Sequence, residues 1–282
     1  TCAADMRLAL CNEVLGTLEF GDQCRYARQL GYDGLEVAPF TLAEDPSGLS
    51  DAQLAGVRAL AAGEGIAIVG LHWLLLKPDG LSITSPDLAV RKRTVEFMQR
   101  LIGMCAQLGG SYLVHGSPGQ RNVPKGESRD AALARAKECW AAAGEAATGS
   151  GLVYCIEPLS ADQTPLVNTL AEAVAIVDEL GLAGLKTMLD TSSAGRSESE
   201  PITSLIDRWV PTGHIRHVQF NDANRMGPGQ GKDRFAPVLA ALKRNGYSGV
   251  VAMEPFKYEP DGPGSAARAI GYVQGILEAL EP

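Results

Sequence analysis

The stretch "LVYCIEPL", residues 152–159, shows the pattern that decides the fold. It is a short apolar run that leads into an acid, Glu157, and a proline. A run of this length, bounded by a turn, is typical of a strand that is buried on both faces, as in parallel sheets. Similar runs rich in Val, Ile and Leu are "LALCN" (8–12), "GLEVAP" (34–39), "IAIVGLHW" (66–73), "SYLVHGSP" (111–118), "LKTMLDTS" (185–192), "IRHVQFND" (215–222) and "GVVAMEPF" (249–256). We therefore expect eight parallel strands.

Stretches with helical periodicity lie between these runs. In residues 85–110, Ser85 is the expected helix cap, Pro86 takes the first helical position, and the helix ends at Gly109-Gly110. The other helical stretches are residues 20–32, 128–151, 168–182, 233–247 and 265–280. Strands that alternate with helices predict an α/β fold, a (β/α)8 or TIM barrel, in which residues 1–282 form a single domain.

A doubly wound sheet is the alternative fold. It would need a glycine loop that cradles phosphate after the first strand, and residues 11–22, "CNEVLGTLEFGD", are not such a loop. Met6 could be the natural start of the chain, which would make residues 1–5 an extension.

Composition narrows the class of protein. The chain has a net charge of −8, whereas nucleic-acid binders usually present a basic face. The longest apolar run, residues 66–76, is about half the length that spans a bilayer. The cysteines lack metal-binding spacing, and the first residues lack the pattern of a signal peptide. We expect a cytoplasmic protein with reduced thiols that binds a small molecule, and neither nucleic acid nor a membrane.

Three acids stand at the ends of the later strands. Glu157, Asp190 and Glu254 each follow a mostly apolar run and precede a turn. Barrel enzymes place their chemistry at the carboxyl ends of the strands, where three neighbouring carboxylates would repel each other strongly. A divalent cation is the simplest physical remedy. The alternative for each acid alone is that it caps the next helix or pairs with a surface base.

The depth of each residue in its strand identifies a fourth ligand. In residues 215–222, His217 and Gln219 face the same side of the strand, and Gln219 lies at the depth of the three acids. His217 lies two residues deeper, where it would support the ligands or fill a polar layer of the core. An oxygen-only set of Glu157, Asp190, Gln219 and Glu254 favours Mn²⁺ or Mg²⁺ over zinc.

These residues carry a family resemblance. The order of "IEP" (156–158), "LDTSSAG" (189–195), "HVQFNDANRMGPGQG" (217–231) and "MEPF" (253–256) resembles the xylose isomerase-like barrels. Within them it is similar to the sugar phosphate isomerase/epimerase group, which includes ketose 3-epimerases and hydroxypyruvate isomerases. The resemblance implies one divalent metal on Glu157, Asp190, Gln219 and Glu254, with the two glutamates moving protons.

The chain departs from ketose 3-epimerases at some positions. Those enzymes usually have His at the position of Gln219, where Gln resembles hydroxypyruvate isomerases, and a substrate-binding His at that of Ser193. A further acid expected near Gln163 is absent, whereas Arg225 matches an Arg that contacts substrate. The resemblance implies a metal-dependent sugar or keto-polyol isomerase or epimerase that transfers protons through a metal-stabilised enediolate. The alternative is a keto-sugar lyase or dehydratase that acts by elimination, alone or with a partner subunit.

Further polar residues are candidates for substrate binding. His115 ends the fourth strand, beside that of Glu157, and is the candidate for an auxiliary base. His72 and Trp73 close the third strand, where one of them would form an aromatic wall against the sugar. Lys77, Arg121 and Arg225 form no obvious phosphate clamp, so we expect an unphosphorylated substrate.

Other expectations complete the prediction. Residues 224–235 are glycine-rich but lack the order of a phosphate-binding loop, and we interpret them as a mobile lid or a turn. A DNA-repair nuclease on the same barrel is disfavoured, because the chain is acidic and has four histidines. A homo-oligomer is expected only as a habit of the family.

Overall fold

The computed structural model describes residues 6–281, in which eight parallel strands close into a barrel in sequence order. The strands are β1 (Arg7–Cys11), β2 (Gly34–Val37), β3 (Ala67–Leu71), β4 (Tyr112–His115), β5 (Val153–Ile156), β6 (Leu185–Asp190), β7 (Ile215–Phe220) and β8 (Val250–Met253). The barrel closes because β8 pairs with β1, with Met253 opposite Leu10. The predicted TIM barrel is confirmed. The extension proposed for residues 1–5 lies outside the described residues.

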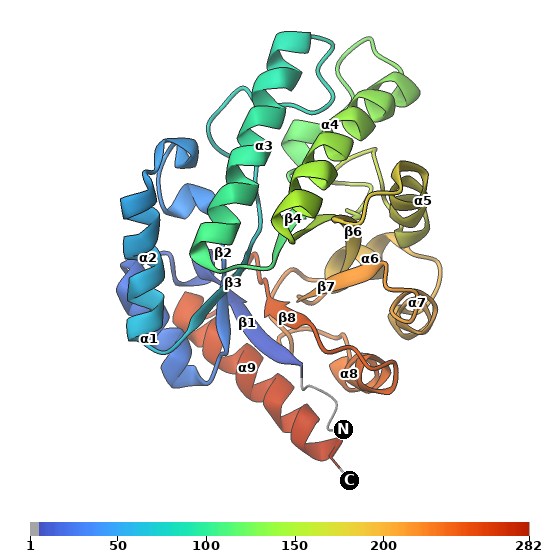
Figure 1. Cartoon of the computed structure of the whole chain (residues 1–282). Helices are drawn as coiled ribbons and strands as arrows, with labels where there is room; N and C mark the ends of the chain where they lie inside the picture. Colours follow the sequence, from blue (N-terminus) through green and yellow to red (C-terminus); the bar gives the residue numbers. More distant parts are fainter. Residues whose placement is uncertain (1–5, 282) are drawn as a thin grey trace.

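Helices surround the barrel (Figure 1). They are α1 (Phe20–Leu30), α2 (Asp51–Gly63), α3 (Leu88–Leu108), α4 (Arg129–Ser150), α5 (Leu170–Leu180), α6 (Thr191–Ser197), α7 (Ile202–Trp209), α8 (Phe235–Arg244) and α9 (Gly262–Ala279). The Tyr32 hydroxyl, just after α1, donates to the carbonyl of Ala266 in α9 at 2.7 Å, which ties the last helix to the first. Within residues 6–281, no helix has the length and apolarity to cross a bilayer.

The structure corrects several predicted boundaries. The helix expected from residue 85 begins at Leu88, because the side chain of Asp87, not Ser85, caps it by accepting from the amide of Ala89. Helix α2 was not predicted, although Ser50 and Gln53 form a capping box at its start. Strands end earlier than the apolar runs, as where β4 ends at His115, because the last residues of each run turn away at the barrel mouth.

A row of residues at one level crosses three strands of the barrel. Glu36 on β2 is paired in register with Gly70 on β3, and Gly70 with Tyr112 on β4. A Cβ at Gly70 would lie 2.5 Å from the ring of Tyr112, so the ring covers the glycine. The Tyr112 hydroxyl thereby reaches across β3 and donates to Glu36 Oε2 at 2.6 Å. The glycine is needed for this close approach.

We expect Gly70→Ala to destabilise the protein by about 1–3 kcal/mol, because the added methyl group must displace the Tyr112 ring. The free energy of unfolding in urea measures this effect. The matched control is Gly103→Ala in α3, where a Cβ meets no atom within 4 Å and the change should stabilise by about 0.5–1 kcal/mol. Equal effects of the two substitutions would contradict the close packing at Gly70.

Candidate active site

Three carboxylates converge at the carboxyl ends of the strands. Glu157 follows β5, Asp190 ends β6 and Glu254 follows β8, and one oxygen of each lies within 4.8 Å of the others. The strands hold them there. The Glu157 amide donates to the carbonyl of His115 at 3.1 Å, and the Glu254 amide donates to that of Phe220 at 3.0 Å. All three side chains are buried.

Burial raises the pKa of each of these acids, and mutual repulsion adds to this for the two glutamates. Burial raises the pKa of Glu157 well above its ordinary value, and the charge of Asp190 adds to this. Burial, then Glu157 and Asp190, likewise raise the pKa of Glu254 well above its ordinary value. Burial also raises the pKa of Asp190, although the Ser193 amide donates to its Oδ1 at 2.7 Å and opposes the shift.

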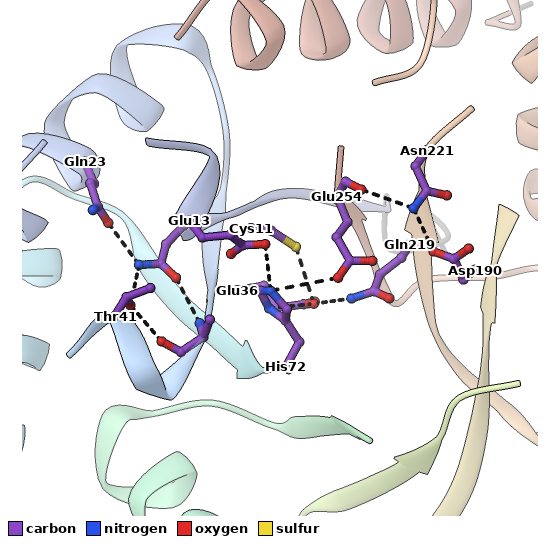
Figure 2. Close-up of polar contacts among 12 residues, drawn as sticks. Cys11, Glu13, Gln23, Glu36, Thr41, His72, Asp190, Gln219, Asn221 and Glu254 are labelled. Carbon is purple, nitrogen blue, oxygen red and sulfur yellow. Dashed lines mark hydrogen bonds and ion pairs between the residues drawn. The ribbon is translucent and has the colours of Figure 1, made fainter. Parts of the chain in front are cut away.

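Gln219 lies on the strand next to Asp190, at the end of β7. Its register partner on β6 is Asp190, so both lie at one level of the barrel. The Gln219 side chain donates through Nε2 to Glu36 Oε1 at 2.6 Å, which leaves its Oε1 buried without a hydrogen-bond partner among the described residues (Figure 2). The amide oxygen is therefore available to a ligand.

The deeper histidine on the same strand supports this arrangement from below. His217 Nε2 lies 2.7 Å from Glu36 Oε2, and its ring stacks on Tyr112 at 4.0 Å between centroids. Burial alone would raise the pKa of Glu36, but His217, His72 and the Tyr112 hydroxyl outweigh it and lower the pKa to about 2. Glu36 is therefore an ionised carboxylate in the core, and it orients Gln219.

The residues present fit a divalent cation. The three carboxylates and the free oxygen of Gln219 form an oxygen-only donor set, and Glu254 Oε2 also lacks a hydrogen-bond partner in the described part of the chain. Asn221 Nδ2 donates to Asp190 Oδ2 at 2.9 Å and to the carbonyl of Glu254 at 3.1 Å. Hydrogen bonds of this kind commonly hold ligating carboxylates in place.

A narrow recess with about 50 Å³ of free space lies over Glu157 and Glu254. Trp73 forms one side and makes edge contacts with Phe40 and Phe256 at 5.7 Å and 5.9 Å between ring centroids. The lining residues are His72, Trp73, Gly116, Ser117, Pro118, Glu157, Leu159, Gln163, Glu254 and Phe256. Both His72 and Trp73 therefore reach the site, rather than one of them.

Two further acids next to the site were missed from the sequence. Glu13 lies just after β1, and its Oε1 is 3.0 Å from His72 Nε2. Burial raises the pKa of Glu13 to about 8. Glu36 is the other, and a single acid within the run "GLEVAP" was its signal. Glu13 follows its strand as the three recognised acids follow theirs, so the same rule could have found it.

The structure places His115 away from the recess. Its Nδ1 lies 2.7 Å from the Tyr154 hydroxyl and 3.3 Å from Trp140 Nε1 on α4, so the ring faces the helix layer. Because an indole nitrogen only donates, Nδ1 accepts and the neutral ring carries its proton on Nε2. Burial, followed by the charge of Arg121, lowers the pKa of His115 to about 3. The expected auxiliary base is thus a neutral structural residue.

The arginines that were candidates for binding substrate or oxyanions already contact other groups of the protein. Arg225 lies at the rim, where its Nη2 contacts Asp162 Oδ2 at 2.8 Å. Asp162 is next to Gln163, so an acid does lie near the position where the sequence analysis found the expected one absent, but it pairs with Arg225 and Arg196. Arg121 is fully buried and donates to the carbonyls of His115, Leu166 and Val167, so it does not bind oxyanions.

The glycine-rich segment 224–235 forms turns rather than a phosphate-binding loop. The amide of Asp233 donates to Asp222 Oδ2 at 3.0 Å, and the amide of Ala223 donates to Asp233 Oδ2 at 2.8 Å. These two bonds close the segment onto the end of β7.

A side chain at position 116 would displace the carboxylate of Glu157. A Cβ at Gly116, just after β4, would collide with Glu157 Oε2. The backbone of Gly116 therefore forms the wall against which this carboxylate rests.

Comparisons with known proteins agree with this geometry. A family described as xylose isomerase-like TIM barrel matches residues 24–275. A D-psicose 3-epimerase of Agrobacterium fabrum is 31% identical over 243 residues, which cover 84% of this chain and 80% of that protein.

Solved structures share the fold. A D-psicose 3-epimerase crystallised in the presence of D-fructose has a TM-score of 0.82 at 23% identity and covers 96% of this chain and 99% of its own. A 3-keto-D-glucoside 4-epimerase from E. coli has a TM-score of 0.83 at 19% identity and covers 96% of this chain and 100% of its own. At these identities the likeness shows the fold alone.

We expect His115→Gln to cost about 1–3 kcal/mol of stability at pH 7.5, because Tyr154 and Trp140 lose a well-placed acceptor, and to leave the catalytic rate unchanged. The unfolded chain binds a proton on His115 near pH 6.5, whereas the folded chain does so only near pH 3. Between these two pKa values, the stability of the parent protein therefore decreases as the pH is lowered. The difference in stability between the parent and the variant should become smaller over the same range. Urea unfolding at several pH values measures this. A large loss of rate with unchanged stability would contradict the structural role.

We expect Gly116→Ala to lower the affinity for Mn²⁺ by about 10–100-fold, because the methyl group must push Glu157 from its place. Titration calorimetry measures the affinity. Gly119→Ala, in the short helix η4 (Pro118–Arg121), is the control, since a Cβ there meets no atom within 4 Å. Equal affinities for the two variants would show that Glu157 does not hold the cation.

Proposed function

Because the chain belongs to the xylose isomerase-like TIM barrel family, we propose that it is a divalent-metal-dependent sugar isomerase or epimerase acting on a ketose or a related keto-polyol. The observation that carries the proposal is the group of Glu157, Asp190 and Glu254 within 4.8 Å of one another, next to the free oxygen of Gln219. The D-psicose 3-epimerase relative supports epimerisation of a ketose in particular.

Glu157, Asp190, Gln219 and Glu254 would hold the cation, and their oxygen-only set favours Mn²⁺ or Mg²⁺. When bound, the cation would polarise the substrate carbonyl and so acidify the adjacent C–H bond. Gln219 is oriented for this role by Glu36, which accepts its amide hydrogen at 2.6 Å.

Two carboxyl groups can move the proton. Glu157 and Glu254 come from β5 and β8, so they reach the recess from different sides of the barrel mouth. One takes the proton next to the carbonyl, and the other returns a proton to the opposite face, which inverts that carbon. Return to the neighbouring carbon would isomerise instead.

The recess favours a neutral sugar. Trp73 offers an aromatic face to sugar C–H groups. Lys77 pairs with Glu44 and Asp79, and Arg121 is bound to backbone carbonyls, so neither is placed to receive a phosphate. Arg225 at the rim is held by Asp162 and remains a candidate for a substrate hydroxyl.

Other predictions stand without a direct test. The named relatives are epimerases, so they give no support to the alternative of elimination with a partner subunit. The free, buried thiols of Cys11, Cys24, Cys105, Cys139 and Cys155 fit a reducing compartment. A cytoplasmic location and a homo-oligomer remain predictions.

Deuterium exchange tests the reaction. Purified protein with Mn²⁺ is incubated in D₂O with D-psicose, D-fructose, L-ribulose and hydroxypyruvate, and we expect deuterium at one carbon of a ketose. Glu157→Gln and Glu254→Gln should each slow epimerisation by about 10²–10⁴-fold. Each variant keeps one of the two glutamates, so it should still exchange the proton of one epimer with deuterium. The two variants should differ in which epimer undergoes this exchange.

Metal content, measured on the same samples, separates loss of the acid from loss of the cation. The surface substitution Glu44→Gln is the control and should leave the rate unchanged. Epimerisation at the parental rate in either active-site variant, or no exchange with any ketose, would contradict the proposal.

A further inference from the structure

A second group of ligand side chains lies on the other side of Glu254. Atoms of Cys11, Glu13, His72 and Glu254 all lie within 4.8 Å of one another. Cys11 ends β1, Glu13 follows in η1 (Asn12–Leu15), and His72 follows β3, so the group is built from the opposite half of the barrel to Glu157 and Asp190. Figure 2 shows Glu254 between these side chains and Asp190.

Buried atoms of this group lack partners. Glu13 Oε2 and Glu254 Oε2 make no hydrogen bond within residues 6–281. Their side chains are 10% and 7% exposed, so water reaches them poorly. A buried polar atom without a partner costs about 1–3 kcal/mol, and a bound cation is a common way to remove that cost.

The histidine is oriented as a metal ligand would be. His72 Nδ1 faces Glu36 Oε1 at 3.3 Å, while Nε2 lies 3.0 Å from Glu13 Oε1 and 3.9 Å from Glu254 Oε1. A carboxylate behind one ring nitrogen is the usual support for a histidine that binds metal through the other. Glu36 therefore contacts the ring of His72 in the same way as it contacts the side-chain amide of Gln219.

When ionised, the acids at the barrel mouth carry more negative charge than one divalent cation balances. Glu13, Glu157, Asp190 and Glu254 carry up to four negative charges when ionised, and one divalent cation balances two of them. A second divalent cation next to Glu13 would balance the others.

We propose that Cys11, Glu13, His72 and Glu254 form a second divalent-cation site, which shares Glu254 with the site of Glu157, Asp190 and Gln219. One sulfur, one nitrogen and two carboxylates form a set that suits a tetrahedral cation such as Zn²⁺ or Co²⁺. The two sites would therefore differ in preference, because the first offers oxygen alone. This inference goes beyond the epimerase proposal and does not require that activity.

Counting bound metal tests the proposal. Metal-free full-length protein is dialysed to equilibrium against Co²⁺ or Zn²⁺, and bound metal is measured by mass spectrometry. We expect two cations per chain in the parent and one in Cys11→Ser, Glu13→Gln and Asp190→Asn. Cys24→Ser, which removes a buried thiol on α1, is the matched control and should keep two. Circular dichroism checks that each variant is folded.

The spectrum of the Co²⁺ protein identifies the ligand. A thiolate-to-cobalt charge-transfer band should be present in the parent, Cys24→Ser and Asp190→Asn, and absent in Cys11→Ser. One cation per chain without such a band, or two cations per chain in both Cys11→Ser and Glu13→Gln, would overturn the second site. Lack of turnover with ketoses would leave these counts unchanged, so failure of the proposed function is distinguished from failure of this inference.

Discussion

The buried carboxylate of Glu36 is the interaction on which the rest of this barrel mouth depends. It accepts from Tyr112 and Gln219 at 2.6 Å each and contacts His217 at 2.7 Å, so it joins β2, β4 and β7 across the interior. Taking such a charge out of water costs several kcal/mol, which only a full set of donors offsets. Because those donors include Gln219, and because His72 faces the same carboxylate, the orientation of the polar groups above it follows from this one charge.

The second constraint is repulsion among acids. The ends of β5, β6 and β8 bring oxygens of Glu157, Asp190 and Glu254 within 4.8 Å of one another, although the three acids are not register partners. Glycines make the crowding possible, since any side chain at Gly116 would meet Glu157. If these acids are ionised, a positive charge is needed at the barrel mouth. If they hold protons, they can take part in proton transfer. The proposed chemistry uses a cation for the first and the two glutamates for the second.

Identical residue types acquired different roles from their surroundings. His72 and His115 both stand at strand ends, but His72 faces the acids, whereas His115 faces Trp140 and Tyr154 in the helix layer. Likewise Arg121 is buried against carbonyls, while Arg225 stays at the rim. Successive side chains of a strand point to opposite faces. A shift of one residue along the strand therefore moves a side chain from the barrel interior to the helix layer.

The sequence by itself predicted the barrel, which the structure confirms, and the four residues that are proposed to bind a metal. Apolar runs of strand length indicated the strands, and the depth of Gln219 within its run identified its level, which its register with Asp190 confirms. Only the tertiary structure showed that Glu13 and Glu36 belong with these residues, because that contact joins segments far apart in the chain. It alone also separated His72 from His115. Periodicity reports which face of one strand is buried, whereas the partner of a buried charge depends on how the whole barrel closes.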